Sequence, residues 1–145
     1  MDDWVTVFGS YLYSGVYSIT PGLKVGSIKK AAAARSLDFT QIDLKGVTGK
    51  ADFLKKVARA LNFPEYFGMN WDALNDCLTD MAWKPAAGYV LLFSSFQSFA
   101  GNAPADMKVV RDIFDLSAQY WKQKAVPFYI LLAEKSPSNR SSSQG

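Results

Sequence analysis

Two uninterrupted apolar runs constrain the fold of this chain more than any other feature. They are GYVLLF at 88–93 and VPFYILLA at 126–133. A strand with one solvated face alternates polar and apolar residues, whereas a continuous apolar run of this length is typical of a strand covered on both faces. Such strands occur in parallel sheets with helices on each side. The two runs therefore predict an α/β fold with a mainly parallel sheet flanked by helices.

Weaker patterns around these runs complete an alternation of strands and helices. Short stretches bounded by turn residues predict further strands, and apolar residues at helical spacing predict helices. Ser27 is a candidate N-cap for the first of these helices. The predicted strands are 14–19 and 39–44, and the predicted helices are 27–36, 50–63, about Trp71 to Met81, and 106–124.

The chain length of 145 residues fits a single small domain. We expect it to span 1–135, with a core at about 38–133 and an extra strand–helix unit before that core. The polar, low-complexity tail at 136–145 is predicted to be disordered. The chain has no apolar run of about 18 residues and no basic N-terminal region of a secretory signal. We therefore expect a cytoplasmic protein without a membrane partner.

The absence of histidine limits the chemistry that this chain can perform. Histidine is the commonest general base and metal ligand, and with one cysteine a zinc site would need carboxylates almost alone. We therefore expect no enzyme, no catalytic residue, no metal and no cofactor. The single cysteine, Cys77, lies on the apolar side of a predicted helix, so we interpret it as a buried structural thiol.

The segment 66–81, YFGMNWDALNDCLTDM, concentrates negative charge in a chain whose net charge is +3. At about 100° per residue, Asp72, Asp76 and Asp80 share one helix face. The helix dipole favours Asp72 in the first turn but disfavours Asp80 near the end, and like charges four residues apart repel. No lysine or arginine occurs between residues 60 and 83. The helix therefore carries three carboxylates without a neutralising neighbour in the sequence.

Several interpretations of this acidic face are open from the residues alone. It could be a solvated helix face, a protein-binding surface, or a divalent-cation site of a metal-dependent hydrolase, although calcium sites prefer loops that wrap the ion. Aromatic side chains beside a charged rim are typical of a protein-binding surface. The aromatic residues near the acidic face are Tyr66, Phe67, Trp71 and Trp83.

The stretch 63–80, FPEYFGMNWDALNDCLTD, resembles the signature of the barstar-like family of intracellular ribonuclease inhibitors. The order of predicted elements over about 38–133 is also similar. The resemblance implies that the loop and the acidic helix fill the active site of a nuclease, where carboxylates take the place of RNA phosphates. It implies that Tyr66, Asp72 and Asp76 contact the nuclease and that Asn70 caps the helix.

The resemblance and the exposed helix face together define the predicted nuclease-binding residues. Asn75 stands where the namesake of the family has a tryptophan. Met81 replaces a second tryptophan, and Trp83 lies two residues after it. These differences concern the identity of the partner more than the mode of inhibition. The predicted nuclease-binding residues are Asp72, Asp76, Tyr66, Asn75, Thr79, Asp80 and Trp83.

The sequence therefore predicts a monomeric bacterial immunity protein that blocks a ribonuclease or a related basic nuclease. The alternative is a non-inhibitory interaction or regulatory module on the same fold. We expect no direct contact with nucleic acid. The basic helix face formed by Lys55, Lys56 and Arg59 is interpreted as a solvated face, because charged faces of this size are routine.

Overall fold

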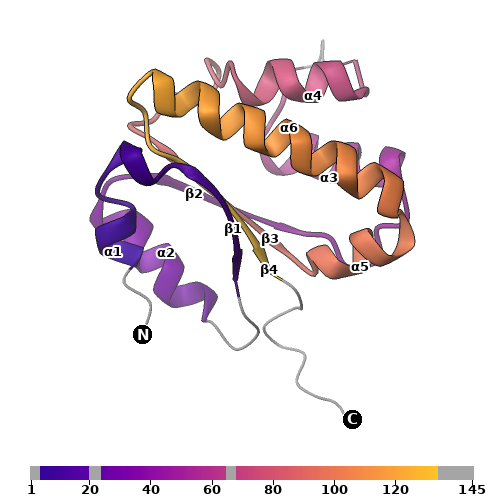
Figure 1. Ribbon diagram of the computed structural model, residues 1–145, viewed down its shortest axis with the longest axis horizontal. Helices are drawn as coiled ribbons and strands as arrows, with labels where there is room; N and C mark the ends of the chain where they lie inside the picture. Colours follow the sequence, from indigo (N-terminus) through magenta and orange to yellow (C-terminus); the bar gives the residue numbers. More distant parts are fainter. Residues whose placement is uncertain (1–3, 20–23, 65–67, 134–145) are drawn as a thin grey trace.

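The computed structural model describes residues 4–19, 24–64 and 68–133 (Figure 1). Its sheet has four strands in the order β1-β4-β3-β2, and every neighbouring pair is parallel. The predicted mainly parallel sheet is confirmed, and the predicted tail at 136–145 lies outside the described residues. The strands are β1 (Gly15–Ile19), β2 (Asp38–Asp43), β3 (Tyr89–Ser94) and β4 (Phe128–Ala133).

The two apolar runs form the centre of the sheet. All residues of β3 and β4 are buried, whereas β1 and β2 at the edges are only partly buried. Helices cover both faces of the sheet (Figure 1). This double coverage is the reason that the central strands have no polar alternation.

The helices form two unequal layers. The larger layer packs on the face that carries Leu91, Phe93 and Ile130, and the smaller layer packs on the face that carries Leu92 and Leu131. The larger layer contains α3 (Lys50–Ala60), α4 (Trp71–Leu78), α5 (Phe96–Asn102) and α6 (Pro104–Gln123). The smaller layer contains α1 (Trp4–Val7) and α2 (Val25–Ala34), and a 3₁₀ turn at Tyr11–Tyr13 precedes β1.

Several helix expectations made from the sequence are wrong in detail. The helix predicted over 50–63 ends at Ala60, because Asn62 adopts a left-handed backbone conformation (φ 55°). Ser27 is not an N-cap, because α2 begins at Val25, whose side chain packs against the smaller core. The helix predicted to reach Met81 ends at Leu78, because Met81 adopts a left-handed backbone conformation (φ 55°) and turns into the core. Helix α5 was not predicted, since only Phe96 and Phe99 mark its buried side.

Tyr129 on β4 ties the N-terminal unit to the sheet. Its side chain is fully buried, and its hydroxyl lies 2.6 Å from the carbonyl oxygen of Ser10 and 3.0 Å from that of Val7. The aromatic ring also packs against Phe8, with 4.9 Å between the ring centroids. The extra unit before the family-like core is therefore part of the hydrophobic structure and is joined to a central strand.

Stability is expected to fall steeply at alkaline pH because of Tyr129. Burial raises the pKa of the Tyr129 hydroxyl to about 12, against an ordinary value of about 10. The unfolded chain therefore releases this proton first. The resulting stabilisation, about 2 to 3 kcal/mol, is complete below pH about 10 and is lost as the pH rises to about 12.

Urea unfolding of the wild type and Tyr129→Phe from pH 8 to 12 measures this effect. The variant loses hydrogen bonds to the N-terminal unit and is expected to be less stable at pH 8 by about 1 kcal/mol. It should also show a shallower decline above pH 10. If the free energy of unfolding fell equally in the two proteins above pH 10, the raised pKa of Tyr129 would not be the cause of the decline.

Candidate functional site

Helix α4 is held in place by its apolar side. Leu74 and Leu78 are buried in the hydrophobic core between the larger helical layer and the sheet, and Cys77 is also buried. At the end of the helix, the indole N–H of Trp121 on α6 donates to the carbonyl oxygen of Leu78 at 2.8 Å. This hydrogen bond satisfies a carbonyl group that a helix terminus otherwise leaves unpaired, and it fixes α4 against α6.

The start of α4 is capped by the residue that the sequence indicates. The side-chain oxygen of Asn70 accepts a hydrogen bond from the backbone N–H of Ala73 at 2.8 Å. Trp71, the first helical residue, packs against the core and lies 6.1 Å from the ring of Phe53 on α3. The cap and the aromatic contact together set the direction in which α4 leaves the preceding loop.

Replacing Asn70 by alanine is expected to destabilise the protein by about 1 kcal/mol, because the N–H of Ala73 then loses its side-chain acceptor. Chemical denaturation measures this loss. Asn70→Asp serves as the control, since aspartate caps equally well and its charge is favoured at a helix N-terminus. Equal destabilisation by the two substitutions would contradict a capping role.

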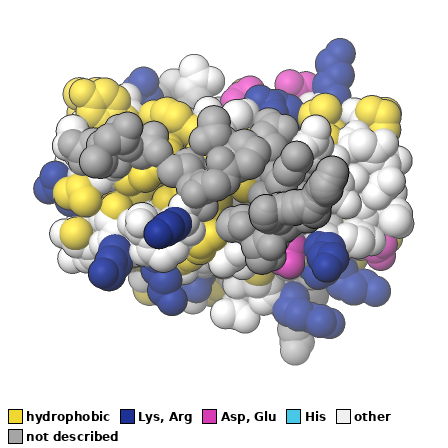
Figure 2. Space-filling model, turned by 90° about the horizontal axis from the view of Figure 1, so that it is seen from below, with side chains coloured by type: hydrophobic (Ala, Val, Ile, Leu, Met, Phe, Trp, Pro, Cys, Tyr) yellow, Lys and Arg dark blue, Asp and Glu magenta, His cyan; other side chains and the backbone are white. Residues whose placement is uncertain are grey.

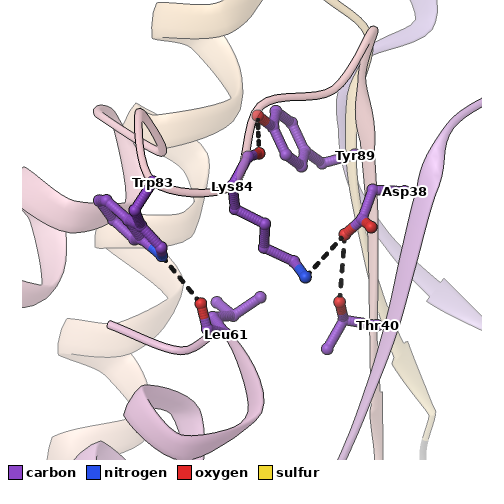
Figure 3. A network of polar contacts seen from close by, with 6 residues as sticks. All are labelled: Asp38, Thr40, Leu61, Trp83, Lys84 and Tyr89. Carbon is purple, nitrogen blue, oxygen red and sulfur yellow. Dashed lines mark hydrogen bonds and ion pairs between the residues drawn. The ribbon is translucent and has the colours of Figure 1, made fainter. Parts of the chain in front are cut away.

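Asp72, Asp76 and Asp80 are all exposed on the outer side of α4 and the turn that follows it. Among the residues that the structure describes, none of their carboxylates forms an ion pair or hydrogen bond. Within the described ranges, the ion pair that does form joins Lys84 to Asp38 at 3.5 Å and includes none of these three aspartates (Figure 3). We refer to Asp72, Asp76 and Asp80 as the acidic patch.

Two residues of the acidic patch act electrostatically on a buried neighbour. Burial raises the pKa of the Cys77 thiol, and the charges of Asp80 and Asp76 raise it further. Cys77 is therefore a protonated, buried thiol, which agrees with the structural role expected from its position.

The face of the molecule that Figure 2 shows differs from the acidic patch in charge, because Lys and Arg predominate among its visible charged side chains.

The structure modifies the predicted ladder of three carboxylates on one helix. Only Asp72 and Asp76 lie on α4, whereas Asp80 lies beyond its last residue and donates its backbone N–H to Cys77 O at 3.2 Å. Asp80 therefore extends the acidic patch past the helix end. A positive charge also lies near the start of α4, although the sequence has no lysine or arginine close to this helix. The Lys50 amino group is 5.3 Å from the ring centroid of Trp71.

The other predicted site residues are less available than the aspartates. Asn75 and Thr79 are half-buried, and the Thr79 hydroxyl donates to the carbonyl oxygen of Asn75 at 2.9 Å. The side-chain oxygen of Asn75 is buried and has no hydrogen-bond partner within the described ranges. Tyr66 lies outside the described residues.

Trp83 is fixed to the end of α3. Its indole N–H donates to the carbonyl oxygen of Leu61 at 3.0 Å, as Figure 3 shows. Its ring meets that of Phe63 edge to face at 5.7 Å between centroids. Trp83 therefore joins the turn after α4 to α3, a role that sequence spacing did not indicate.

The acidic patch does not form a metal cluster with other described residues. Throughout the described part of the chain, no group of three or more carboxylate, thiol or imidazole side chains could hold a metal ion. Exposed carboxylates are acceptors that guanidinium and ammonium groups bind through charge-assisted hydrogen bonds. No helix in the described ranges is both long and apolar enough to cross a membrane.

The described residues thus combine a parallel α/β sheet with an exposed acidic helix. The chain matches the family model Barstar (barnase inhibitor) over residues 37–133. It therefore belongs to the barstar family. The matched region contains α4 and three of the four strands, whereas α1, β1 and α2 precede it.

Similarity to solved structures extends the fold comparison beyond the family region. The ORC2 protein of Aeropyrum pernix, solved as ADPNP–ADP complexes, matches 92% of this chain with a TM-score of 0.59. The identity is 14%, and the match spans 39% of the ORC2 chain. This likeness shows a shared fold alone. None of the curated proteins compared matches the sequence.

Proposed function

We propose that this protein inhibits a ribonuclease or a related nuclease toxin by covering its basic active-site cleft with α4. The observation that carries the proposal is the pair of exposed carboxylates, Asp72 and Asp76, on a helix inside the region matched by the barstar family. The protein acts by occlusion and performs no chemistry of its own. A bacterial cell that makes such a nuclease is protected by a monomeric inhibitor of this kind in its cytoplasm.

The chemistry of RNA cleavage explains why carboxylates suit this role. A nuclease cleft holds phosphate with arginine and lysine, and guanidinium groups also pair with carboxylates through two parallel hydrogen bonds. Opposite charge on the two surfaces speeds their encounter, and pairs that become buried slow dissociation. Asp72 and Asp76 are one helical turn apart, so both can face the same cleft.

The remaining predicted residues have secondary roles in this proposal. Asp80, which is exposed beyond the helix end, extends the negative charge toward the rim of the cleft. The half-buried Asn75, Thr79 and Trp83 border the contact. Tyr66 is assigned to it through its match to the loop tyrosine of the family signature.

Affinity capture from an extract of the native host tests this function. The wild-type protein is compared with Asp72→Asn/Asp76→Asn, which retains side-chain size and removes two charges. The matched control is Asp112→Asn/Asp115→Asn, because these aspartates are exposed on α6 and their replacement gives the same change in net charge. Bound proteins are identified and assayed for RNA cleavage with and without the inhibitor.

We expect the wild type and the α6 control to retain a basic nuclease and to silence it, and the α4 variant to lose both effects. Equal capture and equal inhibition by all three proteins would overturn the role of α4. Retention of a non-nuclease protein with no change in RNA cleavage would favour the alternative of an interaction module.

A further inference from the structure

A groove with a volume of about 500 Å³ lies between strand β2 and helix α3. Ile42, Val47 and Ala60 contribute apolar surface to its lining. Its basic side chains are Lys45 from the loop after β2 and Lys55, Lys56 and Arg59 from α3. We refer to this site as the β2–α3 groove. It contains none of the residues of the acidic patch.

The outer edge of strand β2 faces this groove and pairs with no other strand in the described part of the chain, so we call it an open edge. It is the last strand of the sheet, and its inner side pairs with β3. The backbone N–H groups of Asp38 and Leu44 donate toward β3, each at 2.9 Å. The backbone N–H and C=O groups of successive strand residues point alternately to the two edges of the strand. Those of Gln41 and Asp43 therefore point away from β3. Both residues line the groove.

The charges of the groove favour an anionic occupant of limited charge density. Its four cations form no ion pair in the part of the chain that the structure describes, and Asp43 and Asp52 leave a net charge of about +2. The Asp52 carboxylate accepts a hydrogen bond from Thr48, and that of Asp43 accepts one from the backbone of Lys45. These two carboxylates disfavour RNA, which carries a charge at every nucleotide.

We propose that the β2–α3 groove binds an acidic peptide segment in an extended conformation. The segment adds a fifth strand along the open edge of β2, where the backbone groups of Gln41 and Asp43 supply the hydrogen bonds. Its carboxylates pair with Lys55, Lys56 and Arg59, and its apolar residues meet the apolar lining. This site is additional to α4 and does not depend on nuclease inhibition.

Fluorescence anisotropy with a labelled peptide tests the proposal on the full-length protein. The probe is a short peptide in which glutamate and valine alternate. Reversing two charges with Lys55→Glu/Arg59→Glu is expected to weaken binding about tenfold or more at low salt. The matched control, Lys29→Glu/Lys30→Glu, makes the same charge change on exposed positions of α2 and should leave binding unchanged.

A second pair of variants separates strand addition from simple charge attraction. Gln41→Pro removes an outward N–H without touching the ladder to β3, and proline is tolerated at such an edge. Gln41→Pro should weaken binding severalfold, whereas Gln41→Ala, which also loses the contact from the Gln41 amide to the Ser94 hydroxyl, should not. If the variants fold poorly, the wild type with a probe N-methylated at alternate amides gives the same test, and loss of binding is expected.

Three results would each overturn the proposal. They are absence of saturable peptide binding, equal binding of the N-methylated probe, and tighter binding of a short oligouridylate than of the peptide. The Lys55→Glu/Arg59→Glu variant should still inhibit the nuclease fully, because neither residue belongs to the acidic patch. Failure of nuclease inhibition in the wild type would therefore leave this test unaffected.

Discussion

Replacing Asp72 and Asp76 together by alanine is expected to weaken inhibition of the cognate nuclease at least about 1000-fold. Each carboxylate is proposed to become buried against a guanidinium or ammonium group of the cleft. Removing one partner of such a pair leaves an uncompensated buried charge, which costs about 3 to 5 kcal/mol. Since about 1.4 kcal/mol corresponds to a tenfold change in affinity, even one lost pair approaches the stated effect.

The fold of this variant should remain intact. Both aspartates are exposed and make no side-chain hydrogen bond or ion pair within the described residues. Their loss removes a favourable interaction of Asp72 with the helix dipole but also a like-charge repulsion between the two carboxylates, each worth a few tenths of a kcal/mol. A change in inhibition therefore reports the interface and not the folding of α4.

Titration of the nuclease with each inhibitor gives the inhibition constants. The control Asp112→Ala/Asp115→Ala should stay within about twofold of the wild type, because exposed charges outside an interface contribute little. Wild-type association should slow as salt rises from about 50 to about 500 mM, whereas the double variant should respond weakly. Equal inhibition constants for the wild type and the α4 variant would contradict the decoy mechanism.

Replacing Phe53 by alanine is expected to destabilise the protein by about 3 to 5 kcal/mol, the usual cost of removing a buried phenylalanine. Phe53 is completely buried on α3. It stacks on Phe99 of α5 at 4.7 Å between ring centroids and on Phe93 of β3 at 6.2 Å. Its ring also lies 6.4 Å from Phe114 of α6 and 6.1 Å from Trp71 of α4.

The large effect follows from the position of Phe53 at the junction of these elements. Rigid neighbours from one strand and three helices surround the ring, so the site can collapse only partly around the cavity. Typical domains are stable by about 5 to 15 kcal/mol, and the loss would therefore be a large share of the total. Because Phe53 contacts Trp71, the first residue of α4, the variant is also expected to loosen the packing of the N-terminal end of α4.

Urea unfolding followed by tryptophan fluorescence measures the loss. Phe53→Leu is the matched control, because leucine fills much of the same volume and should cost roughly half as much or less. A loss below about 1 kcal/mol for Phe53→Ala would show that the aromatic junction does not hold the larger helical layer together.

Local patterns in the sequence determined the fold class, the start of α4 and its exposed side. The continuous apolar runs at 88–93 and 126–133 became the two fully buried strands. A continuous run carries this information because each of its side chains needs an apolar neighbour on one face or the other. The cap at Asn70 and the exposed positions of Asp72 and Asp76 were likewise readable, since capping and helix periodicity depend on residues within one or two turns.

Only the tertiary structure decided what surrounds that helix. It ended α4 at Leu78, joined Trp83 to the carbonyl of Leu61, and brought Lys50 over the ring of Trp71. It also placed the basic face of α3 beside the open edge of β2. Periodicity reports which side of an element is buried, but it does not report which distant element covers that side. Contacts between residues far apart in the chain are chosen by packing of the whole domain, and they set the limits of what the sequence alone determined.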